Sequence, residues 1–317
     1  ADVLLVVERP PRELVERLPA GALLVGQLAP FRDRDGIEHF AERGINAFAM
    51  ELMPRISRAQ SMDVLSSQSN LAGYKAVVDA AAEFERAMPM MMTAAGTVPP
   101  ARVMVLGAGV AGLQAIATAR RLGAIVSATD VRPAAKEQVE SLGASFVMVE
   151  DEESAEAETA GGYAKEMSED YKRRQAELVA KTLEKQDIVV CTALIPGRPA
   201  PVLVSKAMVE SMRPGSIVVD LAVEQGGNCE LSVAGEIVDH GGVRIIGHHN
   251  VPGRLPVDAS AMYARNLFNF LSPFVDNESG AIALDWNDEL VVGTALTRDG
   301  AVVHPLLVGE GGASGGS

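Results

Sequence analysis

Short apolar runs alternate, in the N-terminal part of the chain, with a segment that has helical spacing. The runs rich in β-forming residues are Val3–Val7, Ala22–Val25 and Ala47–Glu51, and the segment Ile37–Arg43 suits a helix. Alternating strands and helices are typical of an α/β domain. The first strand begins almost at residue 1, without a signal peptide or basic leader, so we expect this domain to lack an N-terminal part.

A long segment from Met62 to Met88 lacks proline, is rich in alanine and carries its large apolar residues near helical spacing. This pattern predicts one long helix. The sequence TAAGTVPP, Thr93–Pro100, then interrupts the pattern with glycine and paired prolines, as a junction between domains does. We interpret the neighbouring methionines, Met88–Met92, as packing between the domains.

From Arg102 onward, strand and helix patterns repeat. Helices are predicted near residues 110–122, 134–142 and 164–185. The intervening apolar runs are RVMVL, AIVSAT, SFVMV, DIVVCTA, SIVVDLA and VRIIG. Continuous apolar strands separated by helices predict a parallel sheet that is covered on both faces.

The fold class expected from these patterns is α/β, with two Rossmann-like domains and a long connecting helix. The segment Asp258–Phe274 has a helical pattern and is expected to return to the first domain. The second domain, residues 93–252, would then be inserted into an outer domain made of residues 1–92 and 253–317.

A glycine-rich motif opens the inserted domain. Gly107, Gly109 and Gly112 form GxGxxG directly after the strand RVMVL and at the start of a helix. The first glycine allows the turn, the second lets backbone approach a pyrophosphate, and the third lets helix and strand pack closely. The glycines alone could serve a tight turn, but that interpretation leaves Asp130 unexplained.

Asp130 ends the next strand, 18 residues after Gly112, where a carboxylate would accept hydrogen bonds from the adenosine ribose. The motif and the aspartate together predict a dinucleotide site. A carboxylate at this position repels a 2′-phosphate, so NAD is favoured over NADP. Arg132 keeps NADP as an alternative, because a guanidinium can bind that phosphate.

Composition excludes several classes of partner. The net charge of −14 and the pI near 4.9 disfavour nucleic acid and anionic membrane surfaces as general partners. The apolar stretches are far shorter than the roughly 20 residues of a membrane-spanning helix.

Cys191 and Cys229 are not at CxxC spacing, and we interpret them as reduced thiols of a cytoplasmic protein. The adjacent His248 and His249 do not form a ligand pattern on a helix, so no metal site is expected.

A resemblance to a known family covers essentially the whole chain. The stretch RISRAQSMDVLSSQSNLAGYKAV, Arg55–Val77, resembles the NAD(H)-binding component of the proton-translocating nicotinamide nucleotide transhydrogenases. The segments that agree with it are PMMMTAAGTVPPARV, ETAGGYAKEM, TALIPGRPAPVLV and DLAVEQGGNCELS. The resemblance implies NAD(H) binding and hydride exchange with NADP(H) that a second component holds.

The resemblance also implies site residues. Arg55, Gln60, Asp63 and Ser66 would surround the nicotinamide end, with Asp63 and Ser66 on one face of the long helix. In the alternative interpretation, Asp63 and Ser66 only cap that helix. Besides the three motif glycines, the implied cofactor contacts are Val110, Asp130, Val131, Arg132, Gly162, Tyr163, Gln175, Ala193 and Leu194. Gly162 and Tyr163 lie in the segment TAGGYAKEM, Thr159–Met167, which we expect to close over the nucleotide as a lid. The alternative for this segment is an ordinary solvated linker.

Alanine dehydrogenases resemble the same family in fold, and they provide an internal test. They carry a lysine in a KVKEP-like segment and a histidine in an LHLAP-like segment. The comparable segments here are VVERP and GQLAP, which place Val6 or Glu8 at the lysine position and Gln27 at the histidine position. A glutamine cannot take up a proton at neutral pH, whereas hydride exchange between two nicotinamides moves no proton. Glu224 lies where those enzymes have a catalytic carboxylate, and we expect a structural role for it.

The leading functional hypothesis is therefore a homodimeric NAD(H)-binding component at the cytoplasmic side of a bacterial inner membrane. Its expected partners are the NADP(H)-binding component and the membrane proton-channel component of a transhydrogenase, with no membrane span of its own and no nucleic acid. Two alternatives stay open. One is an amino-acid dehydrogenase of the alanine dehydrogenase type, and the other is an NAD(H)-sensing module that binds nucleotide but catalyses nothing.

Overall fold

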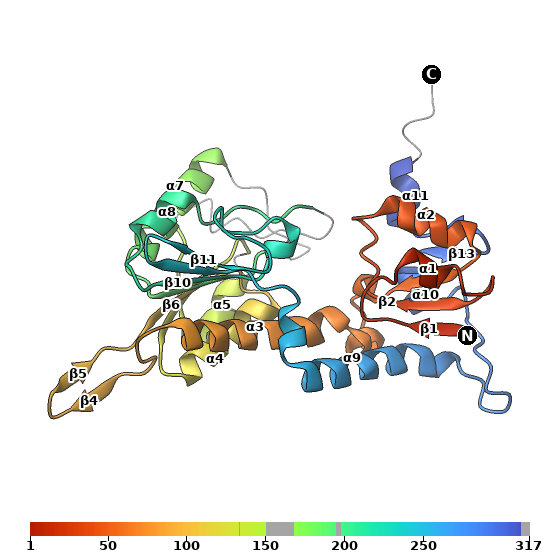
Figure 1. Ribbon diagram of the computed structural model, residues 1–317, viewed down its shortest axis with the longest axis horizontal. Helices are drawn as coiled ribbons and strands as arrows, with labels where there is room; N and C mark the ends of the chain where they lie inside the picture. The colour runs from red at the N-terminus through yellow and green to blue at the C-terminus, as the bar shows by residue number, and fades with distance from the viewer. Residues whose placement is uncertain (133, 150–167, 195–197, 312–317) are drawn as a thin grey trace, which may run out of the picture. The chain divides into compact units, whose positions relative to one another are not determined.

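The computed structural model describes residues 1–132, 134–149, 168–194 and 198–311 (Figure 1). The chain forms two compact units. Unit 1 consists of Ala1–Gln68 and Val257–Ser317, and unit 2 consists of Ser69–Pro256. The helix α3 (Val64–Glu83) carries residues of both units. The boundaries expected after residues 92 and 252 therefore remain predictions.

Unit 2 contains a seven-stranded sheet in the order β11-β12-β10-β9-β6-β7-β8. All neighbouring strands are parallel except the antiparallel pair β11 and β12. The strands are β6 (Arg102–Leu106), β7 (Ile125–Thr129), β8 (Ser145–Phe146), β9 (Ile188–Cys191), β10 (Ile217–Asp220), β11 (Ile237–His240) and β12 (Val243–Ile246). The strand order reverses between β6 and β9, which is the point where open α/β sheets bind their ligands.

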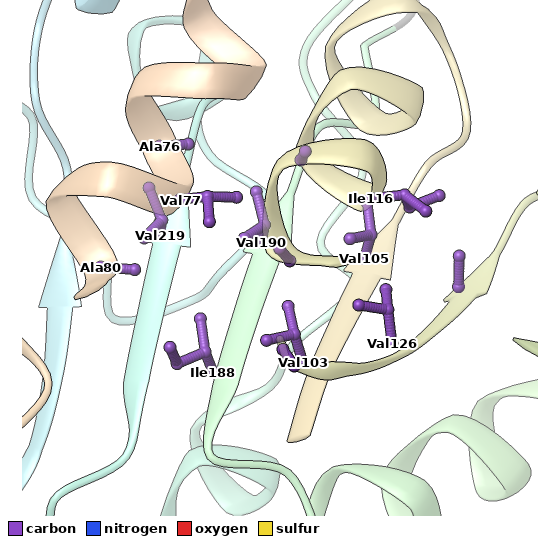
Figure 2. Packing of buried hydrophobic residues seen from close by; sticks show 14 of the residues in the cluster. Ala76, Val77, Ala80, Val103, Val105, Ile116, Val126, Ile188, Val190 and Val219 are labelled. Atoms are coloured by element: carbon purple, nitrogen blue, oxygen red, sulfur yellow. The ribbon is translucent and has the colours of Figure 1, made fainter. Parts of the chain in front are cut away.

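Helices cover both faces of this sheet. On one face, Ala76, Val77 and Ala80 of α3 pack with residues of α4 (Val110–Arg121) and α5 (Ala135–Ser141) against the strands, as Figure 2 shows for the centre of the cluster. On the other face, α7 (Glu169–Leu183) and α8 (Lys206–Ser211) cover β6, β9 and β10. The central strands β9 and β10 are wholly buried. Their unbroken apolar sequences follow from burial on two faces.

Unit 1 contains three parallel strands, β1 (Val3–Leu5), β2 (Leu23–Gly26) and β3 (Asn46–Ala49), in that order. One face of this sheet packs on α9 (Pro256–Leu271), α10 (Glu289–Thr294) and the start of α3. The other face packs on α1 (Arg12–Val15), α2 (Arg34–Glu42) and α11 (Pro305–Gly311). A small hairpin, β13 (Thr297–Arg298) and β14 (Ala301–Val302), completes the unit.

The chain's one tryptophan lies in unit 1. The Trp286 ring packs 5.8 Å from the ring of Phe48, and the guanidinium of Arg298 lies 4.4 Å above the indole. Phe48 in turn contacts Phe270 of α9, with ring centroids 5.9 Å apart. This aromatic group joins β3 to the C-terminal part of the chain.

The expected α/β fold is confirmed, and one local expectation is wrong. The segment Thr93–Pro100 does not simply break the pattern, because β4 (Met91–Thr93) and β5 (Gly96–Val98) form an antiparallel hairpin. Figure 1 shows this hairpin as a two-stranded arm of unit 2. Met88 is buried in the core of unit 2, but Met90, Met91 and Met92 are exposed. The methionines after Met88 therefore lie on the surface of unit 2, and the packing between domains expected for them remains a prediction.

Candidate dinucleotide site

The glycine loop joins β6 to α4, and each of its glycines has a distinct steric reason. Gly107 has a φ of 102°, a left-handed conformation that favours glycine. A Cβ at Gly112 would lie 1.8 Å from the carbonyl oxygen of Gly107. A Cβ at Gly109 would meet no atom within 4 Å, so the space beside the first turn of α4 is open. Because Gly109 gives α4 no side-chain cap, this geometry fits a pyrophosphate at the helix N-terminus.

Thr192 supports the glycine loop from behind and was not predicted. It follows β9, and its hydroxyl donates to the carbonyl oxygen of Gly107 at 2.9 Å. The same hydroxyl would lie 2.7 Å from a Cβ at Gly107 and 3.2 Å from one at Gly112. Thr192 begins the segment TALIPGRPAPVLV, but that segment does not reveal the contact with Gly107, because the contact depends on β9 and β6 being neighbours in the sheet.

Asp130 lies at the carboxyl end of β7 beside the glycine loop. Its Oδ2 accepts from the backbone N–H of Ala108 at 2.7 Å, and its Oδ1 accepts from the backbone N–H of Arg132 at 2.8 Å. The Arg132 guanidinium donates to both oxygens, at 2.9 and 3.0 Å. Burial alone would raise the pKa of Asp130, but the hydrogen bonds from Arg132 and Ala108 outweigh it and lower that pKa. Val131, between the two, is exposed.

Gln175 lies on α7, and its side-chain amide is engaged within the protein. Its Nε2 donates to Thr129 Oγ1 at 3.0 Å and to the carbonyl oxygen of Val147 at 3.3 Å. Its Oε1 accepts from the backbone N–H of Val149 at 2.8 Å. This amide therefore fixes the ends of β7 and β8, and it lies at the same edge of the sheet as Asp130.

Ala193 and Leu194 follow β9 at the point where the strand order reverses. Asn228, which is fully buried, accepts from the Ala193 N–H and donates to the Ala193 carbonyl oxygen, both at 2.9 Å. It also donates to the carbonyl oxygen of Pro201 at 2.8 Å. Leu194 is exposed. The sequence motif containing Asn228 was noted, but its hold on the backbone of Ala193 was not foreseen.

The four residues expected at the nicotinamide end all belong to unit 1. Arg55 precedes the 3₁₀ helix η2 (Ser57–Met62), which contains Gln60, and both side chains are exposed. Asp63 precedes α3 and accepts from the backbone N–H of Ser66 at 2.9 Å and from its hydroxyl. Asp63 therefore caps α3, as the alternative interpretation expected. A contact of Asp63 and Ser66 with a nucleotide stays a prediction.

A second group of polar residues lies at the carboxyl edge of the sheet of unit 1. Gln27 follows β2 and is half-buried beside Tyr263 of α9, whose hydroxyl donates to the carbonyl oxygen of Val6 at 2.8 Å. Burial raises the pKa of Tyr263. Glu51 accepts from the backbone N–H groups of Leu28 and Ala29, at 2.9 and 2.6 Å.

A groove of about 630 Å³ also lies in unit 1, between β1 and α9. Val6 and Tyr263 line it, but it contains none of the predicted site residues.

The pair formed by Glu224 and His249 lies in unit 2, with 3.3 Å between Oε1 and Nδ1. Cys191 and Cys229 are both free and buried.

Gly162 and Tyr163, with the rest of the expected lid, lie outside the described residues. Across the described ranges, no three potential metal ligands come together. No helix in those ranges is long and apolar enough to cross a bilayer.

Comparison with known proteins places the chain in a family. Residues 1–72 match the N-terminal domain, and residues 76–305 the C-terminal domain, described as Alanine dehydrogenase/PNT. The chain belongs to this family. It is 60% identical over 316 residues to the first part of NAD(P) transhydrogenase subunit alpha from Rhodospirillum rubrum, a match that covers 98% of this chain and 82% of the relative. The corresponding protein of Rickettsia prowazekii is 48% identical, over 90% of this chain and 73% of its own length.

Solved structures agree with this assignment. The transhydrogenase from Sinorhizobium meliloti superposes with a TM-score of 0.86 at 58% sequence identity, covering 96% of this chain and 81% of that one. An L-alanine dehydrogenase shares the fold, with a TM-score of 0.76 at 22% identity. The chain is thus a member of the transhydrogenase alpha-subunit family of oxidoreductases, as its motifs had indicated.

Proposed function

We propose that this protein is the NAD(H)-binding component of a proton-translocating transhydrogenase. The observation that carries the proposal is the glycine loop of β6 and α4 together with Asp130 at the end of β7. The open space beside Gly109 suits a pyrophosphate, and the carboxylate of Asp130 suits a ribose without a 2′-phosphate.

Each component of this site has a separate task. Gly107, Gly109 and Gly112 let the backbone of the loop and the first turn of α4, with Val110, approach the pyrophosphate. Asp130, Val131 and Arg132 would face the adenosine end. Ala193 and Leu194 would lie beside the nucleotide, next to the point between β6 and β9 where the strand order reverses. Gln175 keeps the carboxyl ends of β7 and β8 in place around it. Gly162 and Tyr163 would close over the bound nucleotide.

Arg55, Gln60, Asp63 and Ser66 would hold the nicotinamide end. Bound NAD(H) would supply the hydride acceptor or donor, exchanging it with NADP(H) on a second component. This chemistry requires orientation and exclusion of water, and it requires no protein base. Gln27 beside Tyr263 is consistent with that requirement, because neither group takes up a proton at neutral pH.

The same proposal includes the assembly. We expect a homodimer that docks with an NADP(H)-binding component and a membrane proton-channel component at the cytoplasmic side of a bacterial inner membrane. The exposed methionines Met90, Met91 and Met92 on and beside the β4–β5 hairpin are consistent with a protein interface in unit 2.

The test is hydride transfer from NADPH to an NAD analogue, followed by the absorbance of the reduced analogue. The purified NADP(H)-binding component is present in one reaction and absent from the other. Transfer only in the complete mixture is the expected result. Reduction of NAD by alanine without any second component would instead identify an amino-acid dehydrogenase. NADH binding without transfer in either reaction would identify a sensing module.

A further inference from the structure

The carboxylate of Asp130 has no acceptor position left for a ligand. Among the described residues it receives four hydrogen bonds, two on each oxygen. An ionised carboxylate offers about four lone-pair sites in all. A ribose hydroxyl can therefore bind Asp130 only if one of the present donors leaves.

The four donors differ in how easily they can leave. The N–H of Ala108 belongs to a buried residue of the glycine loop, and the N–H of Arg132 belongs to the backbone two residues after Asp130. The other two bonds come from the Arg132 guanidinium, whose side chain is 45% exposed while that of Asp130 is 7% exposed. A rotation of one long, half-exposed side chain frees one site on each oxygen, whereas displacing either amide would move the backbone.

We propose that Arg132 is a latch on the adenosine site, whose guanidinium must leave Asp130 before the ribose of a dinucleotide can be bound there. This inference rests on the proposed function, since it assumes that Asp130 binds the ribose. It assigns Arg132 a positioning role that a direct nucleotide contact would not predict.

The latch has two opposing consequences for the two nucleotides. For NADH, the pair with Arg132 competes with the ribose hydroxyls, so it weakens binding. For NADPH, the same guanidinium offsets the charge of Asp130 and can bind the 2′-phosphate after release, so it favours binding. Arg132 therefore narrows the preference for NADH over NADPH.

The test compares Arg132→Ala with a matched control, Arg102→Ala. Arg102 is the first residue of β6, so it lies at the amino-terminal ends of the strands, whereas Asp130 and Arg132 lie at their carboxyl ends. It is exposed and carries the same charge as Arg132. Calorimetric titration with NADH and with NADPH gives the dissociation constants. We expect R132A to bind NADH about fivefold more tightly, the loss of one competing ion pair, and to bind NADPH more weakly. R102A should change both constants little and in the same direction.

A second variant and a spectroscopic readout keep the test independent of folding. The lysine of Arg132→Lys keeps the charge but cannot form the bidentate ion pair with Asp130. The NADH affinity of this variant should therefore lie between those of wild type and R132A. In the wild-type protein, the ¹⁵N–¹H resonance of Arg132 Nε should shift toward that of a solvated guanidinium on adding NADH.

Three results would overturn the latch. They are weaker NADH binding by R132A, unchanged binding of both nucleotides, and an Nε resonance that NADH does not move. Failure of the proposed function looks different, because the wild-type protein would then bind no NADH, or Asp130→Ala would leave NADH binding intact.

Discussion

Gly73 of α3 lies directly against the first turn of α4, where a Cβ in its place would come within 2.0 Å of the carbonyl oxygen of Ala111. Two helices approach this closely only where one of them has no side chain. The position of the α4 N-terminus, and with it that of the glycine loop, therefore depends on a residue more than thirty positions earlier in the sequence.

Substitution Gly73→Ala should destabilise the protein and weaken NADH binding together. Alanine favours a helix over glycine by about 1 kcal/mol, but the clash is with backbone, so we expect a net loss of about 2 kcal/mol. Denaturant unfolding and NADH titration measure the two effects. Asn70→Ala, at an exposed position of the same helix, is the control and should be neutral or slightly stabilising. A stable G73A protein with normal affinity would contradict the close packing.

Alanine substitutions at Gly109 and Gly112 should separate binding from stability. Gly109 has a φ of −74° and open space around it, so alanine there should change stability by less than about 0.5 kcal/mol. Its methyl group would occupy the space proposed for the pyrophosphate and should weaken NADH binding roughly tenfold, about 1.4 kcal/mol. Gly112→Ala should instead unfold the loop as well, at a cost of about 1–3 kcal/mol. Equal NADH affinity for G109A and wild type would show that the pyrophosphate does not bind there.

The two interpretations of Asp63 can be distinguished with Asp63→Asn and Asp63→Ala. Asparagine caps a helix about as well as aspartate, whereas alanine costs about 1 kcal/mol. If Asp63 also contacts the nicotinamide end, D63N should keep wild-type stability but slow hydride transfer in the complete mixture. If capping is its only task, D63N should transfer hydride at the wild-type rate. Thermal unfolding of both variants checks the predicted difference in their stability.

Glu51 should make stability fall as the pH rises through the mildly acidic range. Burial raises its pKa, only partly offset by the N–H groups of Leu28 and Ala29 and by Arg9. The folded protein therefore holds this proton more tightly than the unfolded chain, so the group's contribution decreases between its ordinary pKa and the raised one. The unfolding free energy of wild type minus that of Glu51→Gln should decline across this window and be flat above it. A difference that rises with pH would mean that the pKa of Glu51 is lowered.

The sequence predicted those features of the site that depend on local geometry. GxGxxG requires a strand before it and a helix after it, and both lie within a few residues of the motif. Gly107 could therefore be assigned to the turn, and Gly112 to the close packing of helix and strand. Asp130 could also be assigned, because the spacing of one βαβ unit fixes where the next strand ends. The fold class followed from the apolar runs, since strands buried on both faces have little choice of composition.

The sequence could not predict contacts that depend on which strands are neighbours. Thr192 supports Gly107 only because β9 lies beside β6, and Asn228 holds Ala193 across a loop. The hairpin of β4 and β5 was missed because a glycine such as Gly96 occurs after a helix and beside the turn of a hairpin equally well, and the paired prolines follow the hairpin. The full occupation of Asp130 was missed because it depends on the rotamer of Arg132.

The position of Trp286 offers an optical consequence. Because the chain's one indole is packed among the aromatic residues of unit 1, its emission senses unfolding of that unit directly. The two buried thiols, Cys191 and Cys229, both lie in unit 2, where alkylation requires local opening. Fluorescence and thiol labelling of the unmodified protein can therefore time the opening of each unit separately. They can also show whether a nucleotide that binds one unit slows the opening of the other.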